Sequence, residues 1–248
     1  MKFTSLAILG SLIGFTGIAS AGEYSYSAPA KGPVVPYEEE PLGFEVGLGY
    51  DSSYIFRGVS FGDHSVWASL DYAIPITDTI EFGLGTWYQA NYDEGDSFEE
   101  LDLIAGLSFG LGSFDLGLGV IWYYFPDDGS DALEIGSSLG TSVGPVDLGS
   151  YVAYDEATDG WYFEISAETT IELTDNIALV PGALISYGDD YYGVDGFNNV
   201  GLSLALPIAL TDTATVTPYI AGSLALEGLD DIGEPDYFYG GISLSVTF

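Results

Sequence analysis

The sequence predicts an all-β fold, a transmembrane antiparallel up-and-down β-barrel of about twelve strands. From residue 44 onward, apolar residues alternate with small or polar ones at a period of two, the pattern of strands whose successive side chains point to opposite faces. The breaks between these segments are short and long in turn, as in barrels with tight turns at one end and longer loops at the other. Short breaks fall at residues 75–79, 112–113, 144–145, 174–176 and 211–213, and long ones at 57–64, 93–97, 126–131, 155–160, 188–196 and 227–236.

Aromatic residues on the apolar parity form two belts. Tyr88 and Trp122 lie near long breaks, whereas Phe44 and Phe114 lie near short ones. Two belts at two depths are typical of the membrane interfaces of a barrel. A soluble β-sandwich gives the same alternation. The exposed sheet edges of a soluble sandwich, however, are usually protected by charged residues, especially Lys, which is absent from these strands, so the barrel is favoured.

The N-terminal segment has the form of an export signal. Residues 1–21 combine Lys2, an apolar run and small residues at the end, which predicts a signal peptide cleaved after Ala21. Residues 22–42 are rich in Pro and Glu and predict a flexible periplasmic tail, and residues 43–248 form the barrel. We expect a bacterial outer-membrane protein in contact with outer-membrane lipid, with both termini periplasmic because the strand number is even. The final strand ends on Phe248, which resembles the signal that barrel-assembly machinery recognises.

The charge balance excludes several other classes. There are 38 Asp and Glu residues against 3 Lys and Arg, for a formal net charge of −35. A nucleic-acid partner is excluded because its phosphates require cations. The absence of Cys excludes a disulfide framework or a thiolate metal site.

The polar parity is predicted to face a water-filled lumen. Its acidic residues concentrate in the first eight strands, whereas the last four carry mainly Gly and Ser, which we expect to leave volume unfilled. Confined carboxylates attract mobile cations, so we expect passive diffusion of small solutes with a preference for cations. The lumen residues predicted to set selectivity are Glu45, Asp51, Arg57, Asp71, Glu81, Glu100, Asp102, Glu134, Glu164 and Glu168, with Asp115, Asp147 and Glu172 on the same parity.

Arg57 is the only basic residue of the predicted barrel. It lies on the inward parity at the end of the first strand, as Trp67 and Trp87 do on the next two strands. We expect Arg57 to stack on these indoles or to pair with Glu100 or Asp102. Two interpretations stay open, a structural brace for the first loop and a substrate-binding group.

The long loops add an acidic rim. Carboxylate oxygens are ligands for Ca²⁺ and Mg²⁺, so Asp127, Asp128 and Asp131 are candidates for a loop site, although a solvated rim is the simpler interpretation. The alternative function is a structural or adhesive surface barrel whose loops bind divalent cations. No other cofactor is expected.

An enzyme is not expected. The single histidine, His64, is followed by Ser65, but adjacent residues of a strand point to opposite faces, so the two cannot form a catalytic dyad easily.

The segment Tyr54-Ile55-Phe56-Arg57-Gly58-Val59-Ser60, followed by Ser69-Leu70-Asp71-Tyr72, resembles the opening of the TorF-type porin family of Gram-negative bacteria. The resemblance implies an outer-membrane barrel of porin type. This chain departs from the family in having fewer basic residues, which bears on the charge of the solute.

Overall fold

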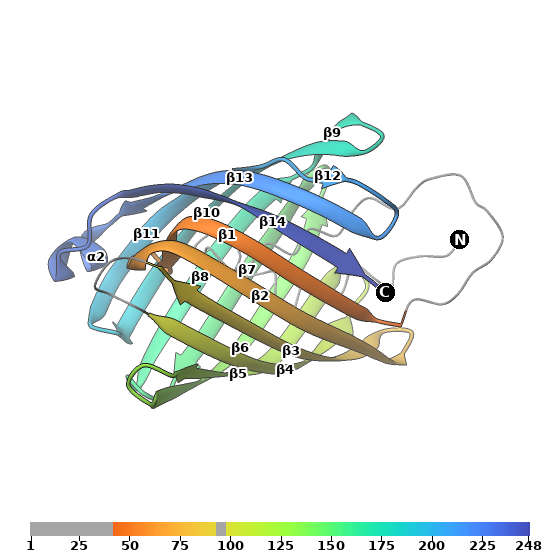
Figure 1. The fold of residues 1–248 in the computed structure, drawn as a ribbon. Helices are drawn as coiled ribbons and strands as arrows, with labels where there is room; N and C mark the ends of the chain where they lie inside the picture. The colour runs from red at the N-terminus through yellow and green to blue at the C-terminus, as the bar shows by residue number, and fades with distance from the viewer. Residues whose placement is uncertain (1–41, 93–97) are drawn as a thin grey trace.

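The computed structural model describes residues 42–92 and 98–248. Within these residues, twelve long antiparallel strands form one closed barrel (Figure 1), which confirms the predicted fold class. The predicted signal peptide, nearly all of the tail and the loop at 93–97 lie outside the described residues. The long strands are β1 (Phe44–Phe56), β2 (Val59–Thr77), β3 (Ile80–Asn91), β4 (Glu99–Gly110), β5 (Phe114–Phe125), β6 (Ser130–Val143), β7 (Val146–Asp155), β8 (Gly160–Thr169), β10 (Ile177–Tyr191), β11 (Val194–Ala205), β13 (Ala214–Ala225) and β14 (Tyr237–Thr247).

Pairing between the first and last strands closes the barrel. β1 pairs with β14 from Glu45↔Thr247 to Asp51↔Gly241, and every other long strand pairs with its neighbours along the chain. Two short strands, β9 (Ile171–Thr174) and β12 (Ile208–Ala209), extend the sheet beside β10 and β13 at the end that carries the short turns. Complete closure leaves no long strand with an unpaired edge.

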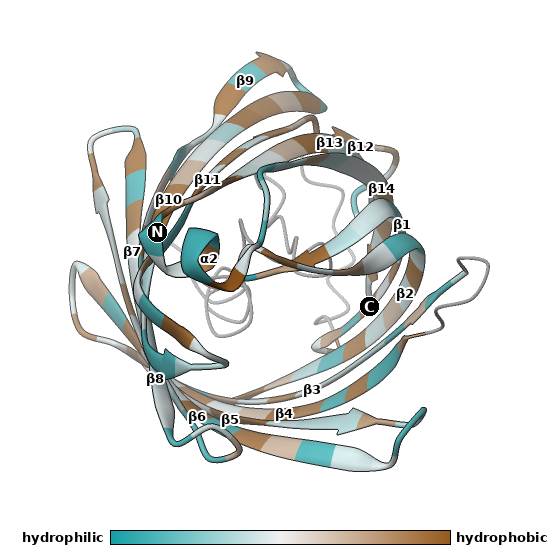
Figure 2. Ribbon diagram, turned by 90° about the vertical axis from the view of Figure 1, so that its left-hand side faces the viewer, coloured by the Kyte–Doolittle hydropathy of each residue, from teal (hydrophilic) through white to brown (hydrophobic). Residues whose placement is uncertain are grey.

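Burial follows the alternation of the sequence. On β6, Glu134 is 0% exposed whereas the next residue, Ile135, is 54% exposed. Large apolar side chains are exposed in the same way on the outer face of β1 to β14. Figure 2 shows the consequence along the ribbon, where hydrophilic and hydrophobic residues alternate around the barrel wall. Acidic side chains therefore line the inside and apolar side chains cover the outside, as predicted.

The five short turns fall where they were predicted, but two predicted long loops are wrong. The break predicted at 57–64 is a two-residue turn, Arg57-Gly58, and the break predicted at 188–196 is the turn Tyr192-Gly193. All four residues have positive φ, from 49° to 86°, as the tight hairpin turns favoured by strand twist require. Polar residues that suggested loops instead extend the strands.

The long break before β14 contains a short helix, α2 (Glu227–Ile232). It lies inside the outline of the barrel when the molecule is viewed along its axis (Figure 2). Its Leu229 is fully buried. Among the described residues, no helix has the length and apolar character needed to cross a membrane.

Candidate functional site

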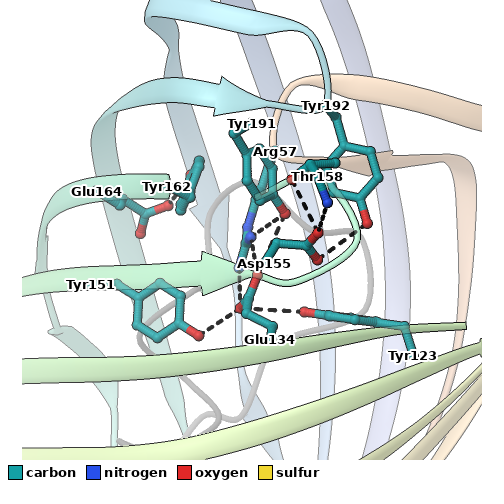
Figure 3. Close-up of polar contacts among 10 residues, drawn as sticks. All are labelled: Arg57, Tyr123, Glu134, Tyr151, Asp155, Thr158, Tyr162, Glu164, Tyr191 and Tyr192. Atoms are coloured by element: carbon teal, nitrogen blue, oxygen red, sulfur yellow. Dashed lines mark hydrogen bonds and ion pairs between the residues drawn. The ribbon is translucent and has the colours of Figure 1, made fainter. Parts of the chain in front are cut away.

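The tip of the β1–β2 hairpin extends into the barrel interior and places Arg57 against the opposite wall. In the order of the strands around the barrel, β1 lies between β14 and β2, whereas β6, β7 and β8 lie on the far side. Nevertheless, the Arg57 guanidinium forms a two-pronged ion pair with Glu134 of β6, with Nη1–Oε2 at 2.6 Å and Nη2–Oε1 at 2.8 Å (Figure 3). Both side chains are almost completely buried. A register shift in the hairpin between Ser53 and Ile55 marks where the pairing becomes irregular before the tip.

Aromatic rings enclose the guanidinium. Its central carbon lies 4.1 Å from the ring centroid of Tyr162, 4.7 Å from Phe56, 5.2 Å from Tyr191 and 5.6 Å from Tyr151. Such distances give cation–π attraction, which is strongest where water is excluded. We call Tyr123, Glu134, Tyr151, Tyr162 and Tyr191 the arginine cage.

Tyrosine hydroxyls complete the environment of the Glu134 carboxylate. Tyr151 donates a hydrogen bond to Oε1 at 2.7 Å, and Tyr123 approaches the same oxygen at 3.5 Å. The hydroxyl of Tyr191 accepts a hydrogen bond from Arg57 Nη1. The buried carboxylate is thus met by a cation and by neutral donors, the condition under which a buried ion pair persists.

The backbone of the hairpin tip is held by a second set of contacts. Asn198 Nδ2 donates a hydrogen bond to the Arg57 carbonyl at 2.6 Å. Gly58 has φ +86°, and a Cβ atom built there would lie 2.5 Å from Cδ1 of Leu229 on α2. Gly58 is therefore required both by the turn and by the close approach of α2.

A polar cluster joins two loops beside the cage. Asp155, which is fully buried, accepts hydrogen bonds from the Thr158 backbone at 2.9 Å and from the Tyr192 hydroxyl at 3.2 Å (Figure 3). Burial, reinforced by the Asp155 carboxylate, raises the pKa of the Tyr192 phenol. Tyr192 therefore remains a neutral donor that ties the β10–β11 turn to the β7–β8 loop.

Two further carboxylates lie near the cage. Tyr162 donates to Glu164 Oε2 at 2.8 Å, and Tyr54 donates to Glu100 Oε2 at 3.0 Å. Glu164 is 3% exposed, and its second oxygen has no hydrogen-bond partner among the described residues. The region contains more buried carboxylates than Arg57 can neutralise.

The predicted lumen acids share the inner face but differ in surroundings. Asp51, Glu81, Glu100, Asp102, Glu134 and Glu164 are buried, whereas Glu45 and Asp71 are half-buried and Glu168 is exposed. Towards the short-turn end, Glu45 lies directly opposite Asp71, and Asp147 lies directly opposite Glu168. Like charges in directly opposed positions repel, so these pairs need water and mobile cations around them.

The predicted partners of Arg57 were wrong. Trp67 and Trp87 are inward and buried, but Arg57 lies over tyrosine rings and pairs with Glu134 rather than with Glu100 or Asp102. The reason is that the hairpin tip bends across the barrel instead of following the wall.

The inward glycines do not simply leave unfilled volume, contrary to expectation. On the last four strands, a Cβ at Gly201 would lie 2.8 Å from Cγ of Leu184, and one at Gly241 would lie 2.2 Å from Oδ1 of Asp51. These glycines make room for side chains of the neighbouring strands.

The carboxylates of the loop suggested for Ca²⁺ or Mg²⁺ do not converge. Asp127 accepts a hydrogen bond from the Glu99 backbone, Asp128 from the Ser130 backbone and Asp131 from the Trp122 indole. Hydrogen bonds from Ser130 lower the pKa of Asp128. Within the described residues, no group of three or more His, Cys, Asp or Glu side chains could hold a metal ion.

His64 and Ser65 contact different groups. His64 Nδ1 lies 2.8 Å from the Tyr50 hydroxyl in an exposed position, whereas the buried Ser65 hydroxyl donates to Gln89 at 2.8 Å. The two side chains are on opposite faces of the wall.

The cage tyrosines were missed by sequence reasoning. Tyr123, Tyr151 and Tyr162 lie on the small and polar parity of their strands, where an aromatic residue is out of pattern. That departure was the available signal.

Comparisons with known proteins agree with the barrel architecture. The KdgM porin superimposes with a TM-score of 0.56 at 6% identity, over 82% of this chain and 99% of that chain. The NanC porin gives 0.53 at 10% identity, over 83% and 100%. Outer membrane phospholipase A from Escherichia coli gives 0.52 at 12% identity, over 96% and 97%. Similarity at these identities shows the fold alone, and porins and a phospholipase share it.

Sequence comparison assigns the family. No curated protein matches the sequence. Residues 37–186, more than half of the chain, match a family described as bacterial proteins of unknown function, named Gcw_chp. The chain belongs to the Gcw_chp family of bacterial proteins.

Proposed function

We propose that the protein is a porin-like channel of the bacterial outer membrane, through which small solutes diffuse passively with a preference for cations. The KdgM and NanC porins support the channel class through their shared fold. The residue-level TorF-type resemblance at residues 54–72 points the same way. An apolar outer face around a closed barrel supports the membrane location.

The observation that carries the cation preference is the charge of the inner face. Its acids include the directly opposed pairs Glu45↔Asp71 and Asp147↔Glu168. Arg57 is the only Lys or Arg among the described residues, and it is already neutralised by Glu134. A mobile anion therefore meets carboxylates without a fixed cation to compensate them, whereas a mobile cation is attracted.

The arginine cage supplies the constriction in this proposal. The hairpin tip packs against Leu229 of α2, and both Leu229 and Arg57 are buried. Passage of solutes then depends on how tightly the tip is held by Glu134.

The test is the reversal potential of the purified protein in planar bilayers under a KCl gradient. We expect K⁺ to be favoured over Cl⁻, and the double variant Glu45→Gln/Asp71→Asn to shift the potential towards zero. Asp212→Asn, which removes one carboxylate from an exposed turn outside the barrel wall, is the control and leaves the potential unchanged. A preference for Cl⁻, or an equal shift in the control, contradicts the proposal.

A structural barrel without transport is the second candidate. The ion pair across the interior favours it, because Arg57 braces opposite walls. Bilayers that stay silent with both the wild-type protein and Arg57→Ala decide for this candidate.

A further inference from the structure

All residues of the arginine cage belong to strands of the barrel wall, whereas the cation that they bind comes from the tip of the β1–β2 hairpin. Tyr123, Glu134, Tyr151, Tyr162 and Tyr191 belong to β5, β6, β7, β8 and β10, which are consecutive in the wall apart from the short β9. Arg57 reaches them from the tip of the β1–β2 hairpin. The wall thus forms a receptor for a guanidinium, and the hairpin supplies a guanidinium from within the same chain.

The chemistry of the cage selects guanidinium among cations. Glu134 meets Nη1 and Nη2 together at 2.6 Å and 2.8 Å, a geometry that a planar guanidinium fits and an ammonium does not. The Tyr162 ring at 4.1 Å offers a face on which a planar cation stacks.

Exchange of one guanidinium for another preserves the charge balance. Withdrawal of Arg57 alone would leave Glu134 buried without a cation, which is strongly unfavourable. When an incoming guanidinium replaces it, the number of buried charges is unchanged, and the tip is released into water. In the proposed channel, a solute of this class would displace the tip from the cage.

A second acceptor lies next to the cage. The Tyr162 hydroxyl donates to Glu164 Oε2 at 2.8 Å, while Glu164 Oε1 has no hydrogen-bond partner among the described residues although the side chain is 3% exposed. A buried carboxylate oxygen without a donor is costly, and a second donor group on the solute would satisfy it.

We propose that the arginine cage is a recognition site for small guanidinium-bearing organic cations, which Arg57 occupies as an internal ligand in the closed state. The proposal rests on the channel function for its physiological meaning, since it names the class of solute that passes the constriction. Binding to the cage can be measured without transport.

The test empties the cage and offers it a free guanidinium. Full-length Arg57→Ala is refolded in detergent with ethylguanidinium or, at equal ionic strength, ethylammonium, and the folded yield and Tm are measured. We expect ethylguanidinium to raise the yield and to raise Tm by about 3–6 °C at ten times its dissociation constant. Ethylammonium should give a much smaller effect.

The double variant Arg57→Ala/Glu134→Gln is the matched control, and it should lose the response to ethylguanidinium. If Arg57→Ala does not fold unaided, rescue of the folded yield is itself the readout. Equal effects of the two cations, no effect of either, or an undiminished response in the double variant would overturn the proposal.

Bilayer recordings separate this proposal from the channel proposal. If ethylguanidinium rescues Arg57→Ala but the bilayers stay silent, the cage proposal stands and the channel proposal is wrong. If the current is cation-selective but ethylguanidinium gives no rescue, the channel proposal stands and the cage proposal is wrong.

Discussion

At the level of single residues, the pair Arg57–Glu134 is a buried ion pair that joins opposite walls of the barrel. Each charge is buried and has the other as its charged partner, so removal of either leaves an unpaired charge. We predict that Arg57→Met and Glu134→Gln each lower the free energy of unfolding by about 3–5 kcal/mol. The double variant should lose less than the sum, because the remaining charge is removed as well.

Urea unfolding of the wild-type protein, the two single variants and the double variant in lipid vesicles measures the four free energies of this double-mutant cycle. Asp212→Asn, in an exposed turn, is the control for loss of one acid and should change the free energy by less than about 0.5 kcal/mol. If the losses of the two single variants add exactly in the double variant, Arg57 and Glu134 do not stabilise each other, which contradicts the prediction.

A glycine on the inner wall provides a second test at the same scale. A Cβ at Gly136 would lie 2.2 Å from the Tyr151 hydroxyl, which donates to Glu134, whereas the nearest atom to a Cβ at Gly110 is at 3.9 Å. We predict that Gly136→Ala lowers the free energy of unfolding by about 1–3 kcal/mol and that Gly110→Ala is nearly neutral. Equal losses in urea titrations would show that the inner wall has room at Gly136.

The sequence predicted which single residues face inward better than which residues meet. The inward placement of Asp51, Trp67 and Glu134 followed from a period of two, since alternation is a local property of a strand. The pairing of Arg57 with Glu134 joins positions 77 residues apart through a bend of the hairpin. Alternation carries no information about such a bend.

At the scale of elements, α2 and the β1–β2 hairpin form one unit at the long-loop end. Leu229 is fully buried, and Gly58 approaches it too closely for a side chain. We predict that Leu229→Ala lowers the free energy of unfolding by about 2–5 kcal/mol and raises single-channel conductance, because the tip loses its packing partner. Ile232→Ala, at an exposed position of the same helix, is the control for both measurements. Equal effects of the two changes would show that the packing of Leu229 against the hairpin tip does not limit conductance.

The sequence predicted the long strands, but it did not predict where the strands end at two of the turns. Short turns with Gly, Pro or Thr-Asp marked one end of the barrel correctly. At the other end, Arg57-Gly58 and Tyr192-Gly193 form tight turns within stretches whose polarity suggested loops. The glycine in each turn was the local signal. Arg and Tyr, which precede these glycines, are not residues that favour positive φ, so the polarity of the surrounding stretch outweighed that signal.

At the scale of the whole molecule, stability depends on which solvent meets the outer face. Leu118 is 45% exposed near the middle of β5, and Phe238 is 79% exposed near the long-loop end of β14. We predict that Leu118→Arg lowers the free energy of unfolding in vesicles by about 2–4 kcal/mol, against about 0–1 kcal/mol for Phe238→Arg, because the penalty depends on depth in the bilayer. Equal penalties in urea titrations would place Leu118 outside the hydrocarbon.

The natural absence of cysteine allows a direct test of the claim that apolar faces of the barrel meet lipid while its acidic faces enclose water. Single cysteines are placed at the neighbours Ser69 and Leu70 and at the neighbours Ser166 and Ile165, and each protein is inserted into lipid vesicles. We predict that cysteines at 69 and 166 react with a water-soluble maleimide, whereas fluorophores at 70 and 165 are quenched by brominated lipid. Equal reactivity at neighbouring positions, together with no lipid quenching, would contradict the claim.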